Sequence, residues 1–211
     1  MKFCEYPKMY FMKNYPSAPI ISSRGCPFSC TFCSAGKLSG KKFRARSPEN
    51  LIKEIKYLKK NYHIKEFQIW DDNFTLNRER AMRFCNLLIE ENINLEWWCP
   101  NGLRIETLDG ELLRKMKQSG FYAMAVGIES GSERIQKDMK KNLNLEKAKE
   151  IVSFAKKIGI RTQGFFIIGY PTETKEDILK TIKIAKELPL SRASFSLFQP
   201  LVGSEIYEDL K

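Results

Sequence analysis

Six short apolar runs alternate with longer segments of helical period from residue 18 onward, and this alternation constrains the fold most strongly. The expected strands lie near residues 18–24, 66–72, 96–103, 122–129, 161–169 and 192–199. The expected helices lie near residues 48–61, 77–92, 109–118, 132–158 with an interruption, 175–188, and from about 204 onward. Repeated strand–helix units build a parallel sheet with helices outside it. A closed eight-unit barrel usually needs about 250 residues, so this chain predicts an α/β fold, a partial and open (β/α)6 TIM-like barrel. A doubly wound open sheet is the alternative.

Residues 18–211 are expected to form one core domain, because a chain of this length suits a single hydrophobic core. Residues 1–17 lack a regular pattern and are predicted to be an irregular N-terminal segment. The chain stops just inside the sixth helix, which leaves a truncation at the C-terminus open. No apolar stretch approaches the roughly 20 residues of a membrane span, and no secretion signal opens the chain. We therefore expect a cytoplasmic protein without a membrane span.

Three cysteines, Cys26, Cys30 and Cys33, form a C-x3-C-x2-C run. An iron–sulfur cluster held by three cysteines keeps one iron open, and that iron can bind a substrate or cofactor. Structural zinc is the main alternative, but tetrahedral zinc needs a fourth ligand and usually takes its cysteines in paired C-x2-C knuckles. The single histidine, His63, falls at the end of a helix and is expected at the surface. The spacing therefore favours an iron–sulfur cluster as the metal site.

The other cysteines and the net charge indicate a function less specifically than the three-cysteine motif does. Cys85 and Cys99 lie in apolar surroundings and are predicted to be buried, whereas Cys4 has no assigned role. Thirty-six basic and 25 acidic residues give a formal net charge of +11, which favours a polyanion such as RNA as a partner. Most lysines, however, punctuate helical segments, where a solvated face needs them. The basic run at residues 41–46 follows the cysteines, and both a solvated loop and a site for an anionic substrate remain open.

The cysteine motif resembles that of the radical S-adenosylmethionine (radical SAM) enzymes, in which an aromatic residue, here Phe32, precedes the third cysteine. The resemblance extends over nearly the whole chain. It implies a [4Fe-4S] cluster whose open iron chelates the amino and carboxylate groups of S-adenosylmethionine. It also implies reductive cleavage of this cofactor to a 5′-deoxyadenosyl radical, which serves hydrogen abstraction or methyl or group transfer on a substrate. Phe32 would lie against the adenine, and a flavodoxin or ferredoxin would donate the electron.

Asp71, Asp72 and Asn73 follow the second expected strand, at the edge where ligands gather in such folds. Acidic residues and asparagine also favour a turn and a helix start here. The alternation of side chains along the strand points Asp72 into the barrel. In the family this position carries a Gly-Gly-Glu-like motif near the methionine amino group of the cofactor. The resemblance therefore makes Asp71, Asp72 and Asn73 candidate cofactor-binding residues.

Two further strand ends carry partial matches to the family. Glu129 ends a strand face whose other side chains are small, and the resemblance places a ribose contact there. The next residue, Ser130, opens a Ser-Gly-Ser-Glu run that fits a helix capping box, so it is a candidate both as a helix cap and as a cofactor ligand. Ile167 and Gly169 match part of the family pattern Gly-x-Ile-x-Gly-x-x-Glu, although Glu173 comes one residue late. The resemblance implies that adenine packs there.

The Asp-Asp-x-Phe-Thr sequence at residues 71–75 is similar to the radical SAM branch that often carries a cobalamin-binding domain before this region. This sequence has no such domain, so cobalamin would come only through a missing domain or a partner. Two alternatives remain: a non-catalytic iron–sulfur module that docks RNA, and an RNA-modifying enzyme similar to methylthiotransferases. The sequence identifies neither the substrate nor a catalytic residue.

Overall fold

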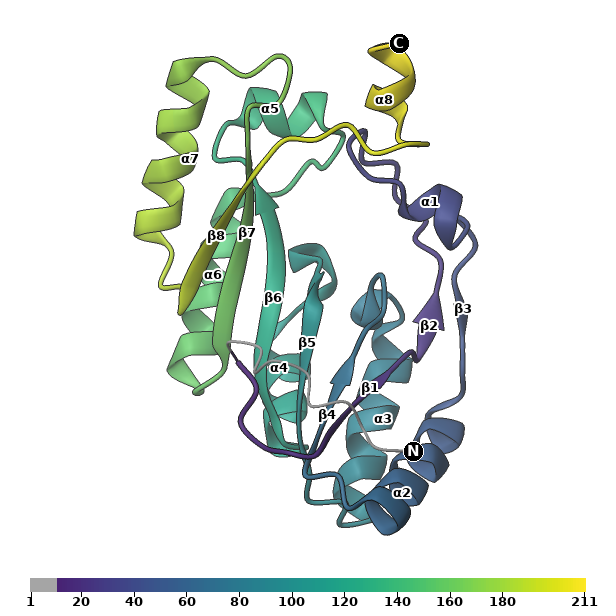
Figure 1. The fold of residues 1–211 in the computed structure, drawn as a ribbon. Helices are drawn as coiled ribbons and strands as arrows, with labels where there is room; N and C mark the ends of the chain where they lie inside the picture. The colour runs from purple at the N-terminus through teal and green to yellow at the C-terminus, as the bar shows by residue number, and fades with distance from the viewer. Residues whose placement is uncertain (1–10) are drawn as a thin grey trace.

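The computed structural model describes residues 11–211, and its main feature is one open sheet of six parallel strands (Figure 1). The strands are β1 (Ser17–Ile20), β4 (Glu66–Ile69), β5 (Glu96–Leu103), β6 (Phe121–Glu129), β7 (Arg161–Ile168) and β8 (Arg192–Leu197). They are hydrogen-bonded in this order, which leaves β1 and β8 as the edges of the sheet. The partial, open (β/α)6 barrel is therefore confirmed. The doubly wound alternative is wrong, because that fold requires the strand order to reverse at a switch point.

The helices of nine residues or more cover the outer side of the sheet, whereas the short α1 (Ala35–Leu38) and α8 (Glu205–Asp209) lie apart from it, as Figure 1 shows. The other helices are α2 (Pro48–Tyr62), α3 (Arg78–Glu90), α4 (Gly110–Gln118), α5 (Glu133–Asp138), α6 (Leu145–Lys157) and α7 (Lys175–Glu187), with 3-10 turns η1 (Phe74–Leu76) and η2 (Ile105–Thr107). The break between α5 and α6 is the predicted interruption. Within residues 11–211, no helix combines the length and the apolar character that crossing a membrane requires.

The first expected strand differs from the prediction, because residues 18–24 hold two separate strands. β1 ends at Ile20, and β2 (Ser23–Arg24) pairs antiparallel with β3 (Arg44–Ala45) in a small second sheet. Strands of two residues are too short to show a hydrophobic period, so the sequence pattern could not reveal them. β2 leads directly into the cysteine-containing loop.

An aromatic cluster fills the core between the sheet and the helices. Trp97 on β5 is fully buried, stacks on Phe67 with ring centroids 5.8 Å apart, and meets Phe84 edge-on at 5.6 Å. Its indole N–H donates to the backbone carbonyl oxygen of residue 119 at 3.1 Å, so burial leaves no polar group unpaired there. Cys85 and Cys99 are buried in the same core, as predicted. Cys4 lies outside the described residues.

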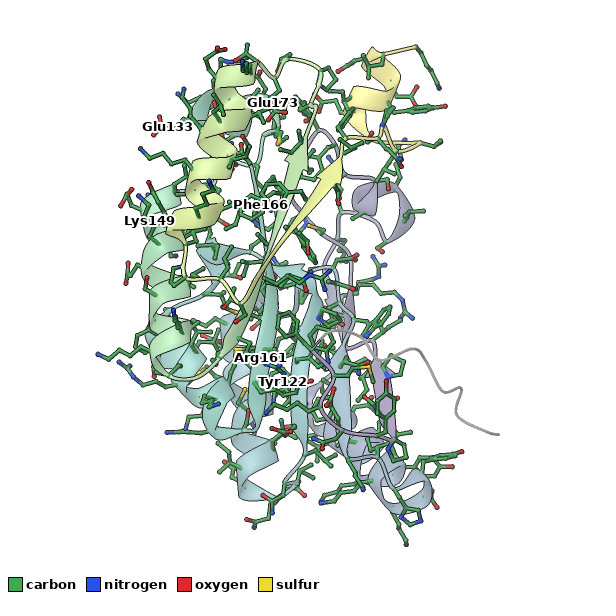
Figure 2. The ribbon with its side chains drawn as sticks, turned by 60° about the vertical axis from the view of Figure 1, so that its left-hand side comes forward. Tyr122, Glu133, Lys149, Arg161, Phe166 and Glu173 are labelled. Carbon is green, nitrogen blue, oxygen red and sulfur yellow. The ribbon has the colours of Figure 1, made fainter. Side chains whose placement is uncertain are left out.

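The amino ends of the strands are closed by the first described residues. Glu66 is fully buried, and its carboxylate accepts hydrogen bonds from the backbone N–H groups of Lys13 at 2.9 Å and Asn14 at 3.0 Å, and from the Tyr122 hydroxyl at 2.7 Å. Figure 2 shows Tyr122 and Glu173 toward opposite ends of the barrel. Because one end is filled by these contacts, the carboxyl end is the rim on which a site can form.

Candidate functional site

The three cysteines lie in the loop between β2 and α1, on the carboxyl-end rim (Figure 1). The loop turns at Gly25, whose φ is +94°, and a Cβ there would stand 2.2 Å from a backbone carbonyl oxygen. Only glycine fits this turn. The Cys26 N–H donates to the carbonyl oxygen of residue 40 at 3.1 Å and closes the loop. Cys26 and Cys30 are half-buried and Cys33 is exposed.

Asp71 holds the base of the cysteine loop. Its buried carboxylate accepts four hydrogen bonds, from the Ser22 N–H at 2.6 Å and hydroxyl at 2.5 Å, and from the Ser23 N–H at 3.0 Å and hydroxyl at 2.6 Å. Arg80 completes the arrangement by donating to the Ser22 carbonyl oxygen at 2.9 Å. A carboxylate offers about four acceptor positions, so the hydrogen bonds from Ser22 and Ser23 occupy all the acceptor positions of Asp71. The geometry makes Asp71 a support of the loop, not the cofactor contact that the resemblance implied.

Asp72 and Asn73 continue the same strand end but have different partners. The Asp72 carboxylate accepts from the Gly25 N–H at 3.0 Å, which brings it beside the cysteine loop. Asn73 is 1% exposed, its side-chain oxygen lies 3.4 Å from the Thr75 hydroxyl, and its amide nitrogen has no hydrogen-bond partner within the described part of the chain. An unpaired buried amide costs roughly 1–3 kcal/mol. Asn73 therefore retains a donor that a ligand can satisfy.

Thr31 joins the cysteine loop to three other segments. Its N–H donates to the Met139 carbonyl oxygen at the end of α5 at 3.0 Å, and its hydroxyl lies 2.8 Å from the Tyr170 hydroxyl after β7. Its carbonyl oxygen accepts from the Ile206 N–H of α8 at 3.0 Å. The sequence reasoning missed Thr31, because a threonine inside a loop carries no periodic signal. These contacts fix the loop against the far side of the rim.

The three thiols line one pocket of about 270 Å³. Residues 203–205 and Glu208 of the C-terminal segment form another part of its wall, together with Lys41. Among residues 11–211, no three Cys, His, Asp or Glu side chains converge on a single metal-ion position. The ligands of a multi-iron cluster surround a volume, because they bind separate iron atoms. Three cysteine sulfurs are a donor set that iron–sulfur clusters take, whereas a tetrahedral zinc ion needs a fourth ligand.

Two cations approach the cysteines from the barrel side. The guanidinium of Arg104 lies 3.8 Å from the centre of the Phe28 ring, and one of its nitrogens is 3.6 Å from the Cys30 sulfur. Burial raises the pKa of Cys26 and Cys33, while positive charge nearby, from Arg104 for Cys26 and from Lys141 for Cys33, acts in the opposite direction. Both cations favour the thiolate form that binds iron.

Glu129 and Lys141 form a buried ion pair on the same rim. The Lys141 ammonium is 3.2 Å from the Glu129 carboxylate, and the two side chains are 8% and 11% exposed, respectively. A Cβ at Gly127 would lie 2.3 Å from that carboxylate, so the glycine makes room for it and shares its side of β6. Glu129 itself has a positive φ of 64° where the β6–β7 register shifts. Since Lys141 occupies only one acceptor position, Glu129 can accept further hydrogen bonds.

Ser130 is fully buried and does not cap a helix, which corrects the capping-box prediction. α5 begins two residues later than that motif requires, with Ser132 as its N-cap. The Ser130 hydroxyl instead lies 3.1 Å from the Thr181 hydroxyl of α7 and accepts from the Ser132 N–H at 3.1 Å. Its position links β6 to α7 and does not bring it into the pocket wall with the cysteines.

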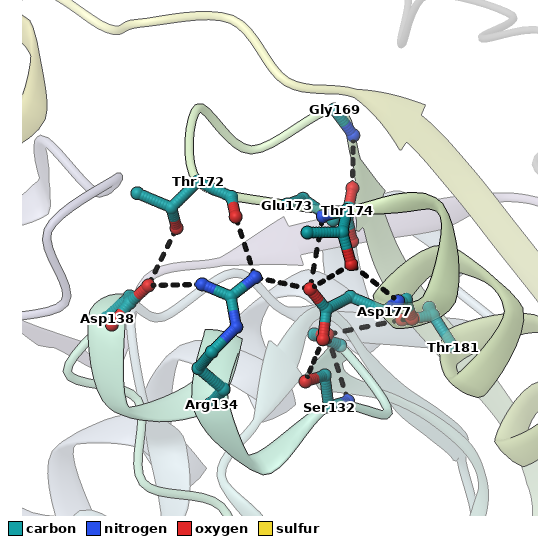
Figure 3. Close-up of polar contacts among 10 residues, drawn as sticks. Ser132, Arg134, Asp138, Gly169, Thr172, Glu173, Thr174, Asp177 and Thr181 are labelled. Carbon is teal, nitrogen blue, oxygen red and sulfur yellow. Dashed lines mark hydrogen bonds and ion pairs between the residues drawn. The ribbon is translucent and has the colours of Figure 1, made fainter.

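A polar network centred on Asp177 supports the rim between α5 and α7 (Figure 3). The carboxylate accepts from the Ser132 hydroxyl at 2.5 Å, from the Thr174 N–H at 3.1 Å and hydroxyl at 2.9 Å, and from Arg134. The hydrogen bond from Ser132 is the first cause, and with those from Thr174 and Arg134 it holds the pKa of Asp177 well below its usual range. A capping box forms at Thr174 and Asp177 instead of at Ser130.

Phe32 and Ile167, both predicted to pack near adenine, come together in one apolar cluster. It also contains Ile135, Met139, Tyr170, Ile206 and Phe198. Gly169 follows with a φ of +82°, no atom lies within 4 Å of where a Cβ would stand, and its N–H donates to Glu173 at 2.5 Å. Burial raises the pKa of Glu173. The late glutamate of the motif therefore folds back onto the glycine turn.

Comparison with known proteins gives a family match. The model of the radical SAM superfamily matches residues 20–185. An uncharacterized methyltransferase of Pyrococcus horikoshii is 36% identical over 199 residues, which cover 94% of this chain and 43% of that protein. The cytidylyl-2-hydroxyethylphosphonate methyltransferase of Streptomyces wedmorensis is 36% identical over 197 residues, covering 90% of this chain and 36% of that protein. The chain thus spans less than half the length of these relatives.

Solved structures show the same fold. The radical S-adenosylmethionine methyltransferase TsrM from Kitasatospora setae, with cobalamin and a [4Fe-4S] cluster bound, superposes with a TM-score of 0.81 at 20% identity, over 91% of this chain and 39% of that one. The cobalamin-dependent S-adenosylmethionine radical enzyme OxsB, with aqua-cobalamin bound, gives a TM-score of 0.68 at 18% identity, over 91% of this chain and 29% of that one. At these identities the likeness concerns the fold.

Proposed function

This chain belongs to the radical SAM superfamily, and from that premise we propose that Cys26, Cys30 and Cys33 hold a [4Fe-4S] cluster with one iron left for S-adenosylmethionine. The observation that carries this proposal is the single pocket lined by all three thiols, on the rim that also bears Asp72 and Glu129. When bound and reduced, the cluster would supply the electron that cleaves S-adenosylmethionine to methionine and a 5′-deoxyadenosyl radical.

The side chains of the rim would bind and orient the cofactor. The ring of Phe32 and the side chain of Ile167 offer an apolar surface for adenine. Glu129, paired with Lys141, has acceptor positions left for the ribose hydroxyls. The unpaired amide of Asn73 and the carboxylate of Asp72 lie after the end of β4, which β5 separates from β6. A buried carboxylate needs such partners, because an unpaired buried charge is costly.

The reaction on the substrate would be hydrogen abstraction or methyl or group transfer. The methyltransferases among the relatives support transfer as one outcome. TsrM and OxsB bind cobalamin in their structures; for this chain, a further domain or a partner would have to supply it.

The test is anaerobic reconstitution of the 211-residue chain with iron and sulfide, followed by dithionite and S-adenosylmethionine. We expect bound iron and sulfide, an electron paramagnetic resonance signal that changes when S-adenosylmethionine is added, and cleavage of the cofactor. Cys30→Ala should lose the cluster. Cys85→Ala, which changes a cysteine buried in the core, should keep it. A wild-type chain that binds no cluster, or equal iron in both variants, would contradict the proposal.

A further inference from the structure

A basic ridge adjoins the exposed side of the cysteine loop. It consists of Lys37 on α1 and of Lys41, Lys42 and Arg44 on the segment that leads into β3, all exposed. Cys33, the exposed member of the three cysteines, lies just before α1 in the chain. Figure 1 shows α1 and β3 along the outer edge of the molecule, apart from the layer of larger helices. The ridge is therefore a surface that a large partner can reach.

The charges of the ridge are not neutralised by the protein itself. Within residues 11–211, no carboxylate forms an ion pair with Lys37, Lys41, Lys42 or Arg44. The Lys41 ammonium instead lies 3.1 Å from the Ser29 hydroxyl.

Two carboxylates also line the pocket, but they have other partners. Glu205 pairs with Lys140 at 2.6 Å, and Glu208 pairs with Lys211 at 2.9 Å. The charge left uncompensated at this edge of the pocket is thus positive.

The proposed reaction consumes one electron per cleavage event, which must come from outside the chain. That electron would pass from a reduced donor to the cluster and then to S-adenosylmethionine, as the bond from sulfur to the 5′ carbon breaks. The donor is oxidised by one electron, and methionine and the radical are the products. A donor protein must therefore dock where the cluster lies nearest to solvent, which is the side of Cys33.

We propose that the basic ridge is the docking surface for an acidic electron-transfer protein that carries a flavin or an iron–sulfur cluster. This inference rests on the proposed function. Opposite charge steers transient encounters and raises their association rates. Leu38, 83% exposed between the lysines, adds an apolar contact beside the cysteine loop. Single-stranded RNA fits the surface less well, because its binding sites place several aromatic side chains along the basic groove, and this segment has Phe43 alone, half-buried.

The first test measures binding of an acidic flavodoxin to the chain at low and high salt. Lys42→Glu reverses a ridge charge on a side chain that does not line the pocket with the cysteines. The matched control, Lys53→Glu, makes the same change on an exposed lysine of α2, at the far end of the molecule (Figure 1). We expect the ridge variant to raise the Kd about tenfold at low salt, and the control to change it by less than about twofold. The difference should vanish near 1 M salt, where the screening length is about 3 Å.

The second test compares electron delivery from two sources in the reconstituted protein. The ratio of flavodoxin-driven to dithionite-driven cleavage should fall about tenfold in the ridge variant, because dithionite is a small reductant that needs no docking surface. An unchanged ratio, or an equal fall in the α2 control, would overturn the inference. So would loss of RNA binding in the ridge variant with flavodoxin binding intact, since that result assigns the ridge to RNA. Absence of dithionite-driven cleavage in the wild type would instead contradict the proposed function.

Discussion

Asp71 and Glu129 are both buried carboxylates at strand ends on the same rim, but their surroundings differ. Asp71 accepts four hydrogen bonds from Ser22 and Ser23. The contact of Glu129 in the described structure is the single ion pair with Lys141. Because a carboxylate offers about four acceptor positions, the first is fully used by the fold and the second is not. An acidic residue at a strand end can thus either have its acceptor positions filled by the fold or keep some of them open to a ligand.

The largest effect is expected from Asp71→Asn. The amide keeps the shape of the side chain but turns a donor group toward donors, and it removes the negative charge that lies near the buried Arg80. We expect the free energy of unfolding to fall by about 3 kcal/mol. The measurement is urea denaturation of the cluster-free chain, followed by circular dichroism.

Two isosteric variants at other carboxylates of the rim test whether the large loss of stability is specific to Asp71. Asp72→Asn affects one hydrogen bond, to the Gly25 N–H, and should cost about 1 kcal/mol. Glu129→Gln should cost about 2 kcal/mol, because the buried Lys141 loses its countercharge although the amide oxygen can still accept its hydrogen bond. A loss for Glu129→Gln as large as that for Asp71→Asn would remove the distinction between the two carboxylates.

A smaller effect, on ligand binding, is expected from Glu129→Gln. If Glu129 accepts the ribose hydroxyls, loss of its charge weakens those hydrogen bonds. We expect the Kd for S-adenosylmethionine to rise about tenfold, or about 1.4 kcal/mol, with unchanged iron content. The measurement is equilibrium binding to the reconstituted protein.

The control for this prediction is Ser130→Ala. Ser130 follows Glu129 in the chain, but its hydroxyl contacts Thr181, so the Kd should stay within about twofold of the wild type. Equal losses in both variants would mean that the whole strand end had shifted, and that Glu129 has no separate role.

The same two carboxylates show how far sequence reasoning reaches. Strand parity placed Glu129 on the side of Gly127, and a Cβ at that glycine would indeed meet the carboxylate. The pattern could not separate the role of Asp71 from that of Asp72, because the partners of Asp71 lie 48 and 49 residues away in the chain. Long-range hydrogen bonds leave no local signal.

The cysteine loop also combines features that the sequence predicted with contacts that it could not predict. Its spacing predicted the donors, and all three thiols do line one pocket. No sequence motif includes the residues that anchor the loop or place positive charge beside its cysteines, namely Thr31, Arg104 and Lys141. Their roles depend on segments that meet only in the folded chain. The sheet was predictable because hydrophobic period and strand order are local properties, whereas the side-chain network around the pocket is not.

The smallest effect on stability is expected from Asp177→Asn, and its dependence on pH extends the comparison between buried carboxylates. Like the carboxylate of Asp71, that of Asp177 accepts hydrogen bonds from donors within the protein. The hydrogen bond from Ser132 contributes most to holding the pKa of Asp177 well below its usual range. A carboxyl with a lowered pKa in the folded state stabilises the fold fully above its unfolded value, about 3.9. That stabilisation is lost as the pH falls from this value through the folded pKa. Asp177→Asn should therefore lower the free energy of unfolding by about 1 kcal/mol at pH 7, a small loss because the ion-pair partner Arg134 is half exposed. The variant should also lose less stability than the wild type as the pH falls below about 4. Urea denaturation at several pH values measures both, with Glu176→Gln, an exposed carboxylate of the same turn, as the control for one lost charge. Parallel pH profiles for the wild type and Asp177→Asn would show that this network does not hold α5 to α7.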